Sequence, residues 1–360
     1  MGLHLKKDYS STQPRQKRKL NVGEPKIFDI TTDDNVKLKL TRYKGGNKGP
    51  VMMVHGLGVA STIFSTDMID ENLLEYLYKN EYDVWLLDLR VSIELEAAAK
   101  QWTGDELAKN DYPCAIRFIK HKTGADSVQA VVHCYGGTTF FMSMLAGLED
   151  VRSIVCSQIA THAVIPKSTQ LKTGLHVPSF LGKLGFESLT AEVEGDENFF
   201  EKLYDKALGI YALSEAQGKC SNPTCHRITF MYASLYRHDQ LTHLLHDNLN
   251  ELFGEANMKT FQHLAEICRK GFLVDFDGND VYLGNLHNLD LPILFISGEN
   301  NECYLPESTA ITYDLLRQNY DKEQYSRKVI KNYGHIDCIF GKNANVDVYP
   351  HILEHLEKTK

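Results

Sequence analysis

The amino-acid sequence predicts an α/β fold in which helices wrap a mostly parallel central sheet. Short, continuous apolar runs at 51–54, 84–87 and 128–132 are typical of strands that are buried on both faces. Stretches with helical character separate these runs, and strands that alternate with helices favour a parallel sheet. The alternation stops over about 162–290 and resumes afterwards, so we expect one sheet interrupted by a single large insertion.

The elements of the core are expected in a regular order. A hairpin comes first, over 27–41, because its alternating pattern breaks at Asp33-Asp34-Asn35. Before the insertion we expect strands over 51–54, 84–87, 128–132 and 153–157 and helices over 72–79, 108–122 and 138–148. After the insertion we expect strands over 292–297 and 327–330, a helix over 309–319 between them, and a closing helix over 348–357.

These elements divide the chain into four parts. Residues 1–22 form a polar, basic arm without the apolar stretch of a secretory signal, and we expect this arm to be disordered. Residues 23–161 and 291–360 form the two parts of the core. Residues 162–290 form a largely helical cap. Its apolar stripes include Leu241, Leu244, Leu245, Leu249 and Leu252.

Composition and charge argue against several classes of partner and location. The net charge of −8 disfavours nucleic acid, because a phosphate-binding surface needs an excess of basic residues. No run approaches the roughly 18 apolar residues of a membrane span. The eight cysteines are scattered and no signal sequence is recognised, which indicates a reducing compartment. We therefore expect a cytoplasmic protein.

Two cysteines of the cap, Cys220 and Cys225, raise the alternative of a zinc site, because thiols and imidazoles are the ligands that zinc prefers. The histidines that follow them are His226, His238, His243 and His246. Their spacing matches no standard zinc finger. A cap loop followed by histidines on helix surfaces is therefore the favoured interpretation, and we expect neither a metal nor a cofactor.

The segment 132–137, Val-His-Cys-Tyr-Gly-Gly, lies between a predicted strand and a predicted helix. In the α/β-hydrolase fold the nucleophile occupies a sharp turn at this place, and the residues two before and two after it need to be small. Gly136 meets this need, whereas Val132 does not. Cys134 stands where most such enzymes have serine. A thiol at a helix N-terminus and near an imidazole is expected to favour its thiolate.

The general base of this fold comes from the loop after the last strand. His335 follows the strand over 327–330, and it follows both the nucleophile and the candidate acid loop in chain order. We therefore predict that His335 is the base for Cys134. His133 and His55 are close to the site in sequence, and we assign them to the scaffold.

The third catalytic residue is expected in the loop after the strand over 292–297. The usual position of its aspartate, three residues after Gly298, holds Asn301. An amide can still orient an imidazole, and Cys–His pairs work with asparagine partners. Glu302 and Glu299 are alternatives that the sequence leaves open.

An oxyanion formed during acyl transfer needs two backbone N–H donors. We expect one of them from Tyr135, the residue after the nucleophile. The other is expected from the glycine-containing turn at 55–58, where Leu57 is the strongest candidate.

Longer motifs carry a resemblance that extends over nearly the whole chain. These motifs are 54–59, 83–90, 133–137, 227–232, 305–309 and 333–341. Through them the chain resembles the α/β-hydrolase proteins that bacteria carry fused to, or beside, cholesterol-oxidase-like flavin oxidoreductases of the GMC type. The resemblance implies an α/β-hydrolase fold and a flavin oxidoreductase as a partner.

Two other branches of the fold share parts of the pattern. The His-Gly-Leu and Val-Trp segments resemble acid lipases, which implies a capped pocket for a bulky, lipid-like ester. The Cys-x-Gly-Gly segment resembles polyhydroxyalkanoate synthases, which use a cysteine for acyl transfer. The chain departs from lipases in having Asn301 in place of aspartate, and it contains no flavin-binding domain. These departures count against ordinary lipase activity and against a redox role.

Together these observations predict a thiol-dependent hydrolase that acts on an ester or thioester of a lipid- or sterol-like substrate through a Cys134 acyl-enzyme. The alternatives are an acyltransferase with the same Cys–His pair and a non-catalytic hydrolase-fold partner of an oxidoreductase. The cap is expected to cover Cys134 and to line an apolar pocket. Candidates for the pocket walls are Phe180, Leu181, Phe186, Phe230, Met231, Tyr232 and Tyr236.

Overall fold

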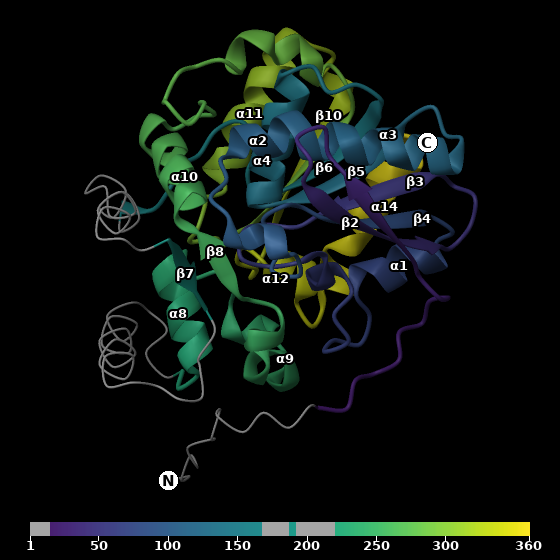
Figure 1. Ribbon diagram of the computed structural model, residues 1–360, viewed down its shortest axis with the longest axis vertical. Coiled ribbons are helices and arrows are strands. Elements are labelled where there is room, and N and C mark those ends of the chain that lie inside the picture. The colour runs from purple at the N-terminus through teal and green to yellow at the C-terminus, as the bar shows by residue number, and fades with distance from the viewer. Residues whose placement is uncertain (1–14, 168–186, 192–219) are drawn as a thin grey trace.

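An eight-stranded sheet forms the centre of the computed structural model, which describes residues 15–167, 187–191 and 220–360 (Figure 1). Its strand order is β1-β2-β4-β3-β5-β6-β9-β10. The first two pairings of this order, β1 with β2 and β2 with β4, are antiparallel, and the other pairings are parallel. This arrangement confirms the predicted mostly parallel sheet.

The strands lie where the apolar runs predict them. Their bounds are β1 Lys26–Thr31, β2 Lys37–Lys44, β3 Pro50–Val54, β4 Asp83–Asp88, β5 Val128–His133, β6 Val151–Ser157, β9 Ile293–Gly298 and β10 Tyr325–Ile330. Every residue of β3, β4 and β5 is buried, as expected for strands covered on both faces.

Helices pack on both faces of the sheet. Figure 1 shows α1 and α14 together on one side and α3, α4 and α11 on the other. The main core helices are α1 Leu73–Lys79, α3 Tyr112–Thr123, α4 Tyr135–Leu145, α11 Glu307–Asn319 and α14 Tyr349–Lys358. Shorter helical segments are η1 Ser61–Phe64, η2 Glu96–Ala99, α2 Gly104–Glu106, η3 Leu107–Asp111, η7 Lys322–Gln324, α12 Asp337–Phe340 and α13 Ala344–Asp347.

The helix expected over 138–148 begins earlier, at Tyr135, and ends at Leu145. Only Cys134 separates it from β5, and Gly136 and Gly137 lie in its first turn. This shift places residue 134 at the helix N-cap, where the partial positive charge of the helix is strongest.

The cap, residues 162–290, leaves the sheet after β6 and returns to it before β9. Its described elements are β7 Ser188–Thr190, α8 Pro223–Met231, η4 His238–Gln240, α9 His243–Asp247, η5 Leu249–Glu251, β8 Glu255–Asn257, α10 Met258–Lys270 and η6 Leu283–Leu289. Most of them are helical, and β7 pairs with β8 in a small antiparallel sheet that the sequence pattern did not predict. In Figure 1, β7, β8, α8 and α9 lie together beside one end of the core.

The prediction of a disordered arm is wrong for residues 15–22. The Arg15 guanidinium forms ion pairs with Asp67 and Glu251, and that of Arg18 pairs with Glu75. These acidic side chains belong to the core and to the cap, and they fix the basic residues against the body of the protein. The remainder of the predicted arm, residues 1–14, lies outside the described residues.

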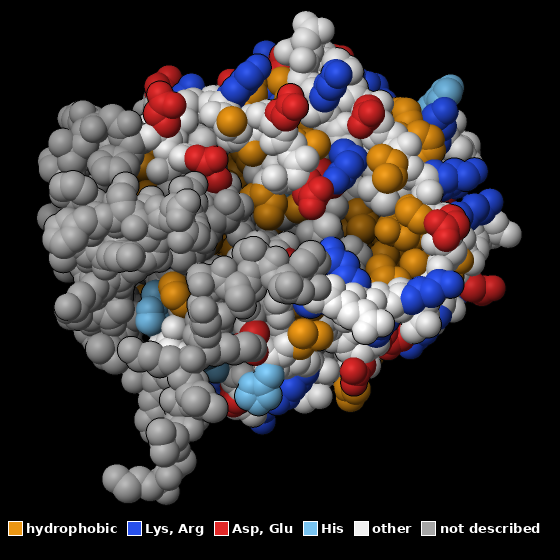
Figure 2. Space-filling view, turned by 60° about the horizontal axis from the view of Figure 1, so that its bottom comes forward, with side chains coloured by type: hydrophobic (Ala, Val, Ile, Leu, Met, Phe, Trp, Pro, Cys, Tyr) orange, Lys and Arg blue, Asp and Glu red, His pale blue; other side chains and the backbone are white. Residues whose placement is uncertain are grey.

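Within the described ranges, no helix has the length and apolar character that a bilayer crossing requires. On the face shown in Figure 2, acidic and basic side chains are interspersed with apolar ones over the described residues. This face therefore presents no broad field of one sign.

Candidate active site

Cys134 has an unusual backbone conformation, with φ 54° and ψ −129°. A residue with a side chain rarely adopts such values, and strain of this kind is concentrated at functional sites. The backbone N–H of Cys134 donates to Ser157 O at the end of β6 (3.1 Å), which helps to hold the turn. The sharp turn expected between strand and helix is thus present, and it lifts the thiol above the end of the sheet.

Two glycines allow the chain to pack closely around this turn. A Cβ atom on Gly136 would lie 2.1 Å from the carbonyl oxygen of His55, so no larger residue fits there. A Cβ atom on Gly56 would lie 3.0 Å from that of Cys134. The turn at 55–58 therefore lies directly against the thiol.

The two predicted oxyanion donors both reach the sulfur. Burial raises the pKa of the Cys134 thiol to about 12. Hydrogen bonds from the backbone N–H groups of Tyr135 and Leu57 lower this pKa, but by less than burial raises it. The expectation that the thiolate is favoured is therefore wrong: at neutral pH the sulfur keeps its proton, because desolvation outweighs the two N–H donors.

His335 lies beside Cys134. One ring nitrogen of His335, one ring nitrogen of His133 and the Cys134 sulfur all lie within 4.8 Å of one another. The cap carbonyl of Leu235 accepts hydrogen bonds from the backbone N–H groups of His335 (3.0 Å) and Ile336 (2.8 Å). Burial lowers the pKa of His335 to about 3, so its imidazole is neutral and can accept a proton.

The expected hydrogen bond from Asn301 or Glu302 to His335 is not formed. Neither ring nitrogen of His335 has a hydrogen-bond partner among the described residues. Asn301 uses its Oδ1 to accept from the backbone N–H groups of Cys303 (2.9 Å) and Tyr304 (3.0 Å), which turns its side chain back into its own loop. Glu302 is exposed, and the Glu299 carboxylate accepts from the backbone N–H of Asn332.

Asn301 reaches the site by an indirect route instead. Its Nδ2 donates to Gln158 Oε1 (2.9 Å), and Gln158 Nε2 donates to Ser157 Oγ (3.2 Å). Ser157 Oγ in turn bonds Nδ1 of His133 (3.1 Å), and the His133 and His335 rings lie 5.0 Å apart, centre to centre. A buried chain of polar side chains therefore ends at a second imidazole beside the predicted base.

His133 is the site residue that the sequence analysis missed by assigning it to the scaffold. The sequence did contain one indication of its role, because His133 directly precedes the nucleophile at the carboxyl end of β5. The pKa of His133 lies well below its usual range, mainly because the ring is buried and to a lesser extent because His335 and His55 are nearby. His55 itself is structural: its Nε2 accepts from the backbone N–H of Leu89 (3.1 Å).

The cap and the loop after β9 supply further neighbours of the thiol. The pKa values of Tyr232 and Cys303 are raised, mainly because both side chains are buried and to a lesser extent because the Cys134 thiol is nearby. The hydroxyl of Tyr232 also lies against Gly58, close to Leu57. The Cys134 side chain is half-buried. Among the predicted wall residues, Phe180, Leu181 and Phe186 lie outside the described residues.

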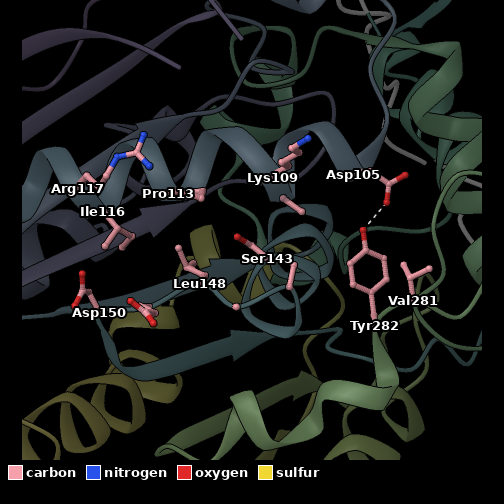
Figure 3. A pocket seen from close by; sticks show the side chains of 14 residues that line it. Asp105, Lys109, Pro113, Ile116, Arg117, Ser143, Leu148, Asp150, Val281 and Tyr282 are labelled. Carbon is pink, nitrogen blue, oxygen red and sulfur yellow. Dashed lines mark hydrogen bonds between the residues drawn. The ribbon is translucent and has the colours of Figure 1, made fainter. Parts of the chain in front are cut away.

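A hollow of about 600 Å³ lies elsewhere, between α3 and the C-terminal end of α4 (Figure 3). Asp105 and Ser143 line it together with Tyr282, which donates to Asp105 across one end. Cys134 and His335 do not line this hollow. The chemistry of the site is therefore argued from the turn at Cys134 and not from the hollow.

Curated proteins with related sequences include several lipases. The chain is 24% identical to gastric triacylglycerol lipase of Rattus norvegicus, over 89% of this chain and 86% of that protein. It is 29% identical to lipase lipl-3 of Caenorhabditis elegans, over 91% of this chain and 87% of that protein. No protein-family model matches the chain.

Solved structures with a similar fold include an esterase of Pyrococcus furiosus (TM-score 0.54, 14% identity, 93% of this chain and 91% of that chain). An α/β-hydrolase from a Penicillium species gives a TM-score of 0.56 at 13% identity, covering 93% of this chain and 99% of that one. With the strand order and the turn at Cys134, these similarities confirm the predicted α/β architecture.

Proposed function

Because the chain has the α/β-hydrolase fold, we propose that it hydrolyses an ester or thioester of an apolar acid, with Cys134 as nucleophile and His335 as general base. One observation carries the proposal. Cys134 occupies a strained turn at the N-terminus of α4, and the backbone N–H groups of Leu57 and Tyr135 both point at its sulfur. This is the combination of a reactive atom and two oxyanion donors that acyl transfer requires.

In the first half-reaction, the Cys134 sulfur attacks the carbonyl carbon of the substrate while its proton passes to His335. The carbonyl oxygen becomes an oxyanion, which the N–H groups of Leu57 and Tyr135 stabilise. The C–O or C–S bond to the leaving group then breaks, and protonated His335 returns the proton to that group. An acyl-enzyme with a thioester bond at Cys134 remains.

In the second half-reaction, neutral His335 takes a proton from water as the water attacks the thioester. The oxyanion forms again in the same place, and the Cys134 sulfur leaves with the proton from His335. The free acid is released. Because the resting pair is a neutral thiol and a neutral imidazole, proton transfer accompanies attack and does not precede it.

His133 serves in this proposal as the positioning residue for His335. When Nδ1–H of His133 donates to Ser157, its Nε2 keeps a lone pair, and this Nε2 has no hydrogen-bond partner among the described residues. It can then accept the ring N–H of His335 and leave the other ring nitrogen of His335 to face Cys134. A neutral imidazole supports the imidazolium less than a carboxylate does, which suits a thiol better than an alcohol.

The proposed substrate class follows from the relatives and from the neighbours of the thiol. Curated relatives over most of the chain are named as lipases. The surroundings of Cys134 include Tyr232, Tyr304 and the other thiols of Cys268 and Cys303. None of these side chains carries a charge at neutral pH, so they favour an uncharged acyl group over a charged one.

The test compares p-nitrophenyl esters of increasing chain length on the wild-type protein and on Cys134→Ala. We expect hydrolysis that improves with chain length in the wild type and is lost in Cys134→Ala. Cys114→Ala is the matched control, because it removes a buried thiol on α3 that donates to the carbonyl oxygen of Thr31 and has no role in the proposed site, so it should keep most of the activity. Equal rates in wild type and Cys134→Ala would rule out the proposed nucleophile.

Acyl transfer is separated from hydrolysis by its products. Adding an alcohol or amine should leave the yield of free acid unchanged if the chain is a hydrolase, whereas a transferase would form a new ester or amide. A flavin oxidoreductase partner and a cytoplasmic location stay predictions, to be examined by co-purification and by fractionation of the native host.

A further inference from the structure

Four side chains of the cap that can bind a metal converge on one point. A single ligand atom from each of Cys220, Cys225, His238 and His246 lies within 4.8 Å of all the others. Nε2 of His246 is 3.3 Å from Sγ of Cys220, and Nε2 of His238 is 3.5 Å from Sγ of Cys225. Neither pair belongs to the site around Cys134.

These separations match those of a tetrahedral zinc site. Bonds of about 2.3 Å to sulfur and about 2.0 Å to nitrogen, at tetrahedral angles, place neighbouring ligand atoms about 3.6 Å apart. An ordinary thiol–imidazole hydrogen bond would explain each cysteine–histidine pair by itself. It would not explain why the ligand atoms of both pairs lie together in one cluster. Two sulfurs and two nitrogens are the ligand set that zinc favours.

The loop before α8 is organised around the same point by Asn222. Its backbone N–H donates to Sγ of Cys220 (3.4 Å), and its Oδ1 accepts from the backbone N–H groups of Thr224 (3.0 Å) and Cys225 (3.4 Å). Its Nδ2 donates to the carbonyl oxygen of His246 (2.6 Å). The Asn222 side chain, which is buried, thus ties both cysteines to α9 and holds the ligands in place.

We propose that Cys220, Cys225, His238 and His246 bind one zinc ion as a structural site. Four protein ligands complete a tetrahedron, which leaves no open position for a substrate or water. Binding displaces the two thiol protons, and the two thiolates balance the charge of the ion. This assignment reverses the interpretation favoured from spacing, because the two histidines come from separate elements, η4 and α9, and so follow no finger pattern.

The proposed zinc site would brace the segment that reaches the active site. Between Cys225 and His238 the chain carries Tyr232, which lies against Gly58, and Leu235. The Leu235 carbonyl oxygen holds the backbone N–H of His335. The ion joins both ends of this segment and would therefore limit the movement of the loop that carries the predicted base.

The direct test is the metal content of the full-length protein, purified without a chelator and without an affinity tag. We expect one zinc ion per chain by elemental analysis in the wild type, and a fall of about tenfold or more in Cys225→Ser and in His246→Gln. His243→Gln is the matched control, because His243 is exposed on α9, three positions before His246, and lies outside the cluster. It should keep the zinc content of the wild type.

A second measurement needs no variant and so does not depend on how the variants fold. Wild-type protein is treated with N-ethylmaleimide before and after a chelator, and the labelled cysteines are identified by mass spectrometry. We expect Cys220 and Cys225 to become reactive only after chelation, whereas labelling of half-buried Cys268 should not change. Replacing the metal with Co²⁺ should add the visible absorption of a tetrahedral thiolate complex.

Three results would overturn the proposal: wild-type protein without stoichiometric metal, equal zinc content in all the variants, or a disulfide between Cys220 and Cys225 in non-reduced protein. Because zinc content is measured without any substrate, this outcome is independent of whether Cys134 hydrolyses esters.

Discussion

The imidazole rings of His133 and His335 lie 5.0 Å apart, centre to centre, at an angle of 57°. The predicted base therefore has a second imidazole beside it where a carboxylate is usual in this fold. Because His133 is neutral, it can orient His335 but cannot strongly stabilise its protonated form. The lack of a carboxylate partner for His335 fits a cysteine nucleophile, since a thiol needs less help from its base than an alcohol does.

We predict that His133→Phe lowers kcat by about 100-fold, the lower end of a general acid–base contribution, because the base His335 stays but loses its orientation, and that it leaves KM nearly unchanged. The ring fills the space but removes the nitrogen that orients His335. Steady-state kinetics on a soluble ester measure the effect, and His133→Asn should restore part of it. His162→Phe is the control, because this imidazole lies 6.5 Å from the ring of Phe272, centre to centre, and is not part of the cluster around Cys134. A change in KM alone would argue against a positioning role.

Asn301→Asp should destabilise the fold by about 2 kcal/mol and should not support a serine nucleophile. The buried amide donates to Gln158 Oε1, and a carboxylate would oppose that oxygen instead. Gln158 cannot turn its amide to compensate, because its Oε1 also accepts from the backbone N–H of Gly298 (3.1 Å).

Urea unfolding measures the cost, and exposed Glu302→Gln serves as its control with a change within about 0.5 kcal/mol. An Asn301→Asp protein of unchanged stability would show that the hydrogen bond to Gln158 is not required. Activity of Cys134→Ser in the Asn301→Asp background would restore Asn301 as the direct partner of His335.

Alkylation of Cys134 by iodoacetamide should accelerate about tenfold for each unit of pH between about 7 and 10, without a plateau. The sign follows from the raised pKa of about 12: below that value the thiolate is the minor form, and its fraction grows with pH. Rates are followed by mass spectrometry, with Cys134→Ala as the background. Fast labelling that is constant near neutral pH would mean that a thiolate–imidazolium pair exists.

Gly136→Ala should be destabilising by about 3 kcal/mol, the upper end for overpacking, because its Cβ would lie 2.1 Å from the carbonyl oxygen of His55 and 2.8 Å from Val54 Cγ1. Gly284→Ala is the control, since no atom lies within 4 Å of a Cβ at that position. Thermal unfolding compares the two. Equal melting temperatures would show that the turn can relax and that its close packing is not required.

The strands and the nucleophile turn could be predicted because their signals are local. Continuous apolar runs mark strands that are buried on both faces, and the glycines after Cys134 mark the turn. The strands β7 and β8 were not expected, because each has three residues and their alternation is too short to recognise. Residues 15–22 were expected to be disordered because the segment is polar and basic. Their order could not be foreseen, since the acidic partners of Arg15, Asp67 and Glu251, are distant in sequence.

The surroundings of His335 could not be predicted for the same reason. Whether Asn301 points to the imidazole or back into its loop depends on which donors its oxygen meets, and these were the backbone N–H groups of Cys303 and Tyr304. Sequence spacing supplied the right loop but not the path of the side chain. The cap ligands were likewise separated by whole elements, so only the folded chain brings His238 and His246 together.

The central claim is that Cys134 carries the acyl group during turnover. The most direct measurement mixes the protein with a slowly hydrolysed thioester, quenches the reaction with acid during turnover, and maps the acylated residue by mass spectrometry. We predict one acyl group per chain on Cys134, and none in Cys134→Ala. An acyl group on any other residue, or turnover by Cys134→Ala at the wild-type rate, would contradict the account.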